Sequence, residues 1–302
     1  MRDGSASGAP AYPKIRPGRS RSEYLARMPE IVRDLTQPDP LDDFDARDLT
    51  FLGQTKRVYV SGKGPAVIVM AEIPGIYPHV SRFARWVREA GFTVWMPNLF
   101  GVAGRPVTTR PSSLLAGLGV MARACISREF RAFAANQSSP VCDWLRALAA
   151  HAFPLCGGRG VGAIGMCFTG NFALSLMLEP AVLAPVLSQP SLPIGQRGGM
   201  HIAPDELARV KARMQREDLT VLAYRFAGDS FCRAERFAAY EEALGDRFVG
   251  RVLPDSAANP DSPMKNPHSV VTSHLIDREG EPTRKARDEI LEFFRMRLLG
   301  SV

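Results

Sequence analysis

The sequence lacks any apolar run long enough to cross a lipid bilayer. Its longest apolar runs, near residues 66–71 and 161–164, fall far short of the roughly 20 residues that a membrane-spanning helix needs. Residues 1–24 also lack the apolar core that a secretory signal requires. We therefore expect neither a transmembrane helix nor export by the secretory route.

Cysteine pairs and cofactor motifs are absent as well. The chain has five cysteines, an odd number, and no two of them form a C-x-x-C pair, which argues against a disulfide framework and against a thiolate zinc site. Neither an H-E-x-x-H motif nor a G-x-x-x-x-G-K-S/T motif occurs. We therefore expect a protein of the reducing cytoplasm that uses neither a metal nor another cofactor.

Acidic residues are scarce at the start of the chain. Across 302 residues, 38 basic and 31 acidic side chains give a net charge of +7. Residues 1–22 hold five of the basic residues and one acidic residue, so most of the net charge lies in this Gly-, Ser- and Pro-rich stretch, which is expected to be a disordered tail. Because no nucleic-acid-binding module is present, we expect neither a nucleic acid nor a membrane as partner.

Beyond the tail, residues 23–302 are expected to form a single α/β domain. Short apolar runs alternate with helix-period segments, which is typical of a mostly parallel sheet flanked by crossover helices. The predicted strands are 56–60, 66–71, 93–96, 161–164, 182–187, 220–227 and 248–253. The predicted helices are 22–35, 81–90, 142–152, 171–178, 204–217, 232–244 and 284–299.

Residues 104–140 do not fit this alternation and are interpreted as a helical insertion. The segment begins with a loop rich in Pro, Thr and Arg, continues as an apolar helical stretch over residues 114–133, and ends in a polar turn. In an α/β enzyme such a segment above the sheet can close over the site as a lid. One more helix that packs on the outside of the domain fits the pattern equally well.

The segment from Val161 to Leu174 is the most informative. A buried strand runs into a turn of small residues, and an apolar helix leaves the turn at once. This is the context that makes G-x-S-x-G a nucleophile elbow, here with Cys167 at its centre. The residues two positions away must be small to let strand and helix close up. Gly165 meets this demand, whereas Thr169 stands where a glycine is usual.

This position has two chemical consequences for Cys167. At the N-terminus of a helix, the free N–H groups and the helix dipole favour the thiolate. The N–H of Phe168, the next residue, would point to where an oxyanion forms. The alternative is a buried structural cysteine, because free cysteine is among the most buried residue types.

Three segments resemble the dienelactone hydrolase family, whose members have the α/β-hydrolase fold and a Cys-Asp-His triad. Residues 67–101 resemble the first long βαβ unit of the family, including its Glu-Ile-x-Gly turn, and residues 165–170 resemble its G-x-C-x-G-G elbow. The third segment, RFAGDSFCRAERF followed by NPHSVVTSHL, resembles its acid and histidine loops. The resemblance covers about residues 50 to 297, without the insertion, and implies an α/β-hydrolase fold.

The resemblance implies a role for each residue of a triad. Cys167 would be the nucleophile, and Asp229, at the end of the predicted strand 220–227, would be the acid. His268, which opens the family's Pro-His-Ser-Val stretch, would be the base. His274 is its rival in the same segment.

Glu72 and Ile73 complete the site that the resemblance implies. The N–H of Ile73 would be the second oxyanion donor, beside that of Phe168. Glu72 resembles a family glutamate that contacts the resting cysteine and is displaced when substrate binds. A carboxylate at that position raises the pKa of a neighbouring thiol by repelling the thiolate.

The arginines that hold the substrate carboxylate in dienelactone hydrolases are not in place. Gly101 follows Leu99-Phe100, where the first of these arginines is expected, and Thr272 stands where the second is expected. Arg105 is the nearest arginine to the first position and is the candidate substrate-binding residue.

The expected function is hydrolysis of an ester or lactone bond in a small molecule, through the Cys-His-Asp triad and a covalent acyl-cysteine intermediate. The alternative is a non-catalytic small-molecule-binding protein on a hydrolase scaffold, since fold does not determine function. Neither the acyl group of the substrate nor the oligomeric state follows from the sequence.

Overall fold

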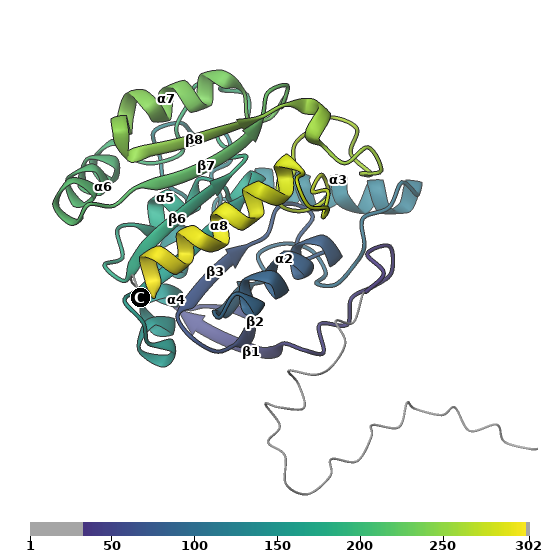
Figure 1. Ribbon diagram of the computed structural model, residues 1–302, viewed down its shortest axis with the longest axis horizontal. Coiled ribbons are helices and arrows are strands. Elements are labelled where there is room, and N and C mark those ends of the chain that lie inside the picture. Colours follow the sequence, from purple (N-terminus) through teal and green to yellow (C-terminus); the bar gives the residue numbers. More distant parts are fainter. Residues whose placement is uncertain (1–32, 300–302) are drawn as a thin grey trace, which may run out of the picture. The chain divides into compact units, whose positions relative to one another are not determined.

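The computed structural model describes residues 33–299. The chain divides into two units, residues 1–34 and 35–302, and the second unit contains an eight-stranded sheet (Figure 1). The strand order in the sheet is β1-β2-β4-β3-β5-β6-β7-β8. The strands are β1 (Asp45–Phe51), β2 (Gln54–Gly62), β3 (Ala66–Met70), β4 (Thr93–Pro97), β5 (Val161–Met166), β6 (Val182–Ser188), β7 (Val221–Phe226) and β8 (Phe248–Leu253).

The predicted mostly parallel sheet is confirmed. Strands β3 to β8 run parallel, and only β1 and β2 pair antiparallel to their neighbours. All seven predicted strands are present. The sequence analysis missed β1, whose side chains are mostly exposed and which lacks the apolar run of a buried strand.

Helices cover both faces of the sheet. The α-helices are α2 (Pro78–Glu89), α3 (Pro111–Ile126), α4 (Val141–Cys156), α5 (Phe172–Leu176), α6 (Pro204–Glu217), α7 (Ala234–Leu244) and α8 (Pro282–Leu298). Alternate residues of β3 enter opposite cores, because successive side chains of a strand point to opposite faces. Ala66, Ile68 and Met70 pack with α4 to α7, whereas Val67 and Val69 pack with α2 and α8, which cross the near face in Figure 1.

The insertion contains one helix, α3, which ends earlier than predicted. Ser127 has an extended backbone, and an irregular segment then leads to α4. Three contacts hold this segment in place: Ser139 Oγ donates to the Phe130 carbonyl, and the His201 ring lies 2.7 Å from Ser139 Oγ and 3.0 Å from the Ala134 carbonyl. The segment after α3 is therefore tied to the loop that follows β6.

Two expectations from the sequence fall on the first unit. The disordered tail of residues 1–22 and most of the predicted helix 22–35 lie outside the residues that the structure describes. Within residues 33–299, no helix is long and apolar enough to cross a membrane.

Candidate active site

Cys167 stands on a strained turn between β5 and α5. Its φ is +52°, a left-handed conformation that costs an L-residue roughly 1–2 kcal/mol. Gly165 has no room for a side chain, because a Cβ there would lie 2.0 Å from the Thr169 carbonyl oxygen. A Cβ at Gly170 would lie 2.5 Å from the Cα of Pro190. The turn therefore has the backbone that a nucleophile elbow requires.

Thr169, which departs from the glycine expected there, stabilises this turn. Its buried hydroxyl accepts a hydrogen bond from the Met166 N–H at 2.9 Å and donates one to the Met70 carbonyl at 2.9 Å. Met166 ends β5 and Met70 ends the neighbouring strand β3. The departure thus does not disrupt the turn but ties it to the strand that leads to Glu72.

His268 and Asp229 form a buried pair. His268 Nδ1 lies 2.7 Å from Asp229 Oδ2, and both side chains are almost fully buried. Asp229 follows β7, where the carboxyl ends of parallel strands face the crevice. Its other oxygen, Oδ1, accepts hydrogen bonds from the Phe231 N–H at 2.9 Å and the Cys232 N–H at 3.0 Å. The carboxylate is therefore fixed on both sides.

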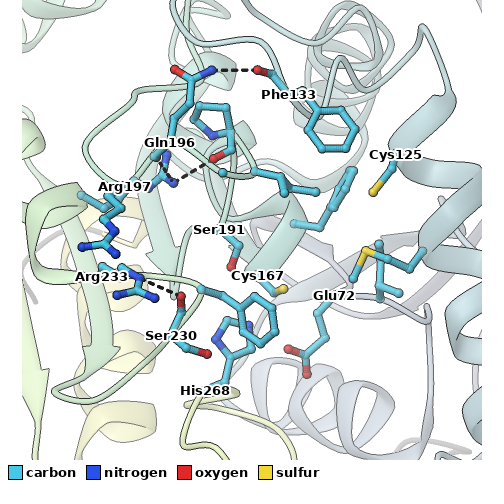
Figure 2. Close-up of a pocket in the computed structure, with 18 of the residues that line it drawn as sticks. Glu72, Cys125, Phe133, Cys167, Ser191, Gln196, Arg197, Ser230, Arg233 and His268 are labelled. Atoms are coloured by element: carbon cyan, nitrogen blue, oxygen red, sulfur yellow. Dashed lines mark hydrogen bonds between the residues drawn. The ribbon is translucent and has the colours of Figure 1, made fainter.

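His268 faces Cys167 with its other nitrogen. One side-chain ligand atom from each of His268, Cys167 and Glu72 lies within 4.8 Å of the others, and His268 Nε2 is buried with no hydrogen-bond partner. Burial lowers the pKa of His268, but the charge of Cys167 and the hydrogen bond with Asp229 outweigh it, so that the pKa stands well above its usual value. Figure 2 shows Cys167 between His268 and Glu72.

The rival histidine, His274, organises the loop. Its Nδ1 accepts a hydrogen bond from the Ser269 N–H at 3.1 Å, and its Nε2 donates to the Met264 carbonyl at 2.9 Å. Burial lowers the pKa of this imidazole. With both nitrogens engaged by backbone groups, His274 supports the segment that presents His268.

Glu72 is buried and anchored by four donors. Its Oε1 accepts hydrogen bonds from the hydroxyls of Tyr77 and Thr272. Its Oε2 accepts from the Ser269 hydroxyl at 2.8 Å and from Gln189 Nε2 at 3.2 Å. In this conformation the carboxylate lies beside Cys167 but is held by groups from three other segments of the chain.

The two expected oxyanion donors flank Cys167. Ile73 and Phe168 both line the same cavity as Cys167. Within residues 33–299, no acceptor takes the Ile73 N–H in a hydrogen bond. That N–H is therefore available to a bound substrate.

The cavity above Cys167 has a volume of about 500 Å³. Much of its wall is apolar and comes from Ile73, Met121, Phe133, Phe168, Ile194, Phe231 and Met264. Met121 and Phe133 belong to the insertion. Cys125, which also lines the cavity, belongs to it as well. The insertion therefore forms part of the cavity wall.

Arg105 does not reach this cavity. It is exposed and is not among the residues that line the cavity. The preceding Gly104 is fixed by backbone hydrogen bonds, from its N–H to the Ile76 carbonyl and from the Asp39 N–H to its own carbonyl. The turn thus leaves Arg105 in solvent, and the substrate role expected for it is not supported by its position.

Three other arginines line the cavity. Arg236 is buried and donates to the carbonyls of Leu192, Pro193, Gln196 and Gly199, so it holds the loop after β6. Arg197 and Arg233 are exposed, with Arg197 Nη1 3.6 Å from Glu235 and Arg233 Nε donating to the Ser230 carbonyl at 3.2 Å. Figure 2 shows both on the side of the cavity opposite Cys125. No local motif marks these arginines in the sequence.

The cluster of Glu72, Cys167 and His268 has donor atoms that a metal ion could use. The four donors to Glu72, however, match an anionic carboxylate without a metal. Asp229, likewise, is a suitable hydrogen-bond acceptor for a protonated nitrogen of His268. The arrangement fits nucleophilic and acid–base chemistry.

The mostly parallel sheet has the architecture of the α/β-hydrolase fold, with a cysteine on a strained strand–turn–helix and a buried His-Asp pair above the carboxyl ends of its strands. The model of the dienelactone hydrolase family matches residues 50–244, and the chain belongs to that family. The carboxymethylenebutenolidase of a Pseudomonas species is 30% identical over 137 residues, which are 45% of this chain and 53% of that protein. The match thus spans about half the length of this relative.

Solved structures show the same fold. A dienelactone hydrolase-like promiscuous phosphotriesterase from metagenomic libraries superposes with a TM-score of 0.52 at 21% identity, over 84% of this chain and 99% of that one. A dienelactone hydrolase from Anabaena variabilis superposes with a TM-score of 0.51 at 14% identity, over 87% and 99%. The predicted fold and family are confirmed.

Proposed function

We propose that the protein hydrolyses an ester or lactone bond of a small molecule through an acyl-cysteine intermediate. One observation carries this proposal: Cys167, with its strained backbone, and the buried His268–Asp229 pair lie close together at the cavity. A structural cysteine needs neither the strain nor the histidine.

In the first half of the reaction, His268 Nε2 takes the thiol proton and Cys167 attacks the acyl carbon. Asp229 holds the imidazole with Nδ1 protonated and stabilises the imidazolium that forms. The leaving alcohol takes its proton from His268. In the second half, His268 activates a water molecule, which hydrolyses the thioester and restores the thiol.

The N–H groups of Ile73 and Phe168 would stabilise the oxyanion in both halves. One such donor contributes about 2.7–4 kcal/mol to the transition state in enzymes where it has been removed. The Ile73 N–H supports this role, because it has no hydrogen-bond acceptor within residues 33–299 and is available to substrate.

Glu72 would modulate the nucleophile electrostatically. A carboxylate close to the sulfur disfavours the free thiolate, whereas the adjacent imidazolium favours it. In this proposal the thiolate forms together with the imidazolium of His268, while the four donors hold the Glu72 carboxylate in place beside it.

The cavity favours a substrate with an apolar acyl part and an acidic group. Its wall is mostly apolar near Cys167, and Arg197 and Arg233 lie at one side. Arginine forks match the geometry of a carboxylate. These two residues therefore replace Arg105 as candidates for substrate binding.

The proposal is tested by assaying a panel of lactones, aryl esters and thioesters with the wild type and with Cys167→Ala. We expect turnover of at least one class, with a preference for acidic substrates that Arg233→Ala reduces. Cys167→Ala should have no activity although it stays folded by circular dichroism. Wild-type turnover by that variant, or no turnover of any class by the wild type, would contradict the proposal.

A further inference from the structure

The outer face of α3 is an exposed apolar strip. Leu115, Leu118 and Ile126 expose 69%, 65% and 81% of their surface. At 3.6 residues per turn, their spacing places all three on one side of the helix, with Gly119 and Ala122 between them. Isolated exposed leucines are common, but a continuous strip of this kind indicates a binding surface.

The side of α3 next to this strip belongs to the cavity. Met121 and Cys125 line the cavity, and Ala124 is buried against the core. Cys125 follows Leu118 by seven residues, about two turns of the helix, so the exposed strip adjoins the side of α3 that lines the cavity. In Figure 1, α3 stands at the edge of the fold.

The insertion around this strip is cationic. Among residues 104–140 the only acidic residue is Glu129, and it pairs with Lys56. The exposed cationic residues of the insertion are Arg105, Arg110, Arg123, Arg128 and Arg131. Within residues 33–299, none of these five arginines forms a salt bridge.

Glu129 is thus the one acidic residue in the sequence of the insertion, and its charge is already neutralised by Lys56. Arg110 is the N-cap of α3, Arg123 lies in its last turn and Arg128 follows two residues after its end, so these arginines lie close to the apolar strip. Apolar side chains flanked by arginines are typical of helices that lie in the interface of an anionic lipid surface.

We propose that the outer face of α3 docks on an anionic lipid surface, with Leu115, Leu118 and Ile126 inserted between headgroups and the arginines against lipid phosphates. The 16-residue helix is too short to span a bilayer and would lie along its surface. A second copy of the chain fits this face less well, because a two-fold contact would bring the same arginines towards one another.

This surface is distinct from the membrane contacts that the sequence analysis excluded. That expectation rested on the lack of a spanning run and on the composition of residues 1–22, whereas the strip becomes visible only once α3 is folded. Because Met121 and Cys125 line the cavity from the same helix, docking would bring the cavity close to the lipid.

The test is co-sedimentation of the full-length chain with vesicles made of phosphatidylcholine and phosphatidylglycerol in about equal parts. The variant Leu115→Gln/Leu118→Gln is compared with Leu52→Gln/Leu155→Gln, which changes two leucines that are exposed to a similar extent, 72% and 61%, away from the insertion. Residues 1–22 are present in every variant, so their attraction to anionic lipid cancels. Unfolding midpoints confirm that both variants are folded.

We expect the wild type and the control variant to bind alike, and Leu115→Gln/Leu118→Gln to bind about tenfold more weakly or worse, since two large apolar side chains no longer insert. Arg123→Glu/Arg128→Glu should also weaken binding. Equal binding by the α3 leucine variant and its control would overturn the proposal. Light scattering supplies a second test. If the wild type is a dimer that Leu115→Gln/Leu118→Gln dissociates, and vesicle binding does not change, the face serves self-association and the lipid proposal is overturned.

Discussion

The hydroxyl of Thr169 joins two neighbouring strands by donating a hydrogen bond to the Met70 carbonyl at 2.9 Å. The same oxygen accepts from the Met166 N–H, so one buried side chain connects the end of β3 with the end of β5. These strand ends lead to Glu72 and Cys167. The relative position of the two residues therefore depends on Thr169.

Thr169→Val tests this connection, because valine keeps the shape but removes both hydrogen bonds. The Met166 N–H and the Met70 carbonyl each lose a partner in a buried site, so we expect a loss of about 1–3 kcal/mol in the free energy of unfolding. Thr169→Ser, which keeps the hydroxyl, is the matched control and should lose less. Urea denaturation measures both, and a valine variant as stable as the wild type would contradict the assignment.

The strain at Cys167 gives a second prediction. Alanine and glycine both remove the thiol, but only glycine adopts a φ of +52° without cost. Relief of roughly 1–2 kcal/mol outweighs the entropic cost of glycine, about 0.5–1 kcal/mol. Cys167→Gly should therefore unfold at a higher denaturant concentration than Cys167→Ala. The reverse order would show that the turn is not strained.

Asp229→Asn should reverse the tautomer of His268. The N–H groups of Phe231 and Cys232 require an acceptor at the position of Oδ1, so the amide oxygen must take that place and the NH₂ group must face His268. The imidazole then accepts at Nδ1 and carries its proton on Nε2, where it cannot act as a base. We expect kcat to fall by about 10²–10⁴ in an ester assay with little change in the unfolding midpoint. Near-wild-type activity would rule out the proposed role of Asp229.

Stability should fall in mild acid because of two histidines outside the site. Burial lowers the pKa of both His79 and His201 to about 4, whereas an unfolded histidine titrates near ~6.5. Between these pKa values only the unfolded chain binds the protons, so the free energy of unfolding decreases as the pH falls from about 6.5 towards 4. Each histidine contributes up to ~1.4 kcal/mol per pH unit.

Urea denaturation at a series of pH values across this range measures the slope. His201→Gln, which cannot titrate there, should make it shallower than that of the wild type. His151→Gln, at a half-buried histidine on α4, serves as the comparison variant. An unchanged slope in His201→Gln would show that His201 does not titrate with a lowered pKa.

Much of the fold could be predicted because its strands are buried on both faces. All five residues of β3 are buried, and a parallel strand of this kind produces an apolar run that stands out in the sequence. β1 could not be predicted, since its stability comes from pairing with β2 in a hairpin and not from an apolar pattern. The end of α3 was missed because the apolar character of the sequence continues beyond Ser127.

The candidate site could be predicted only where it is local or resembles the family. Cys167 lies in a strand–turn–helix pattern, and Asp229 and His268 lie in segments that match by position. The anchoring of Glu72 by Gln189 and Thr272 depends on loops far apart in the sequence, so no local pattern reveals it. The same holds for Arg197 and Arg233 at the cavity. Arg105 was expected at the site because it lies close to Leu99-Phe100 in the sequence, but this closeness does not bring its side chain to the cavity.

The most direct test of the proposed mechanism is intact-protein mass spectrometry after rapid mixing with an activated aryl ester. The account predicts that the wild type gains the mass of one acyl group, that peptide mapping places it on Cys167, and that Cys167→Ala gains none. Acylation of another residue, or steady turnover of the ester by Cys167→Ala, would contradict the assignment of Cys167 as the nucleophile.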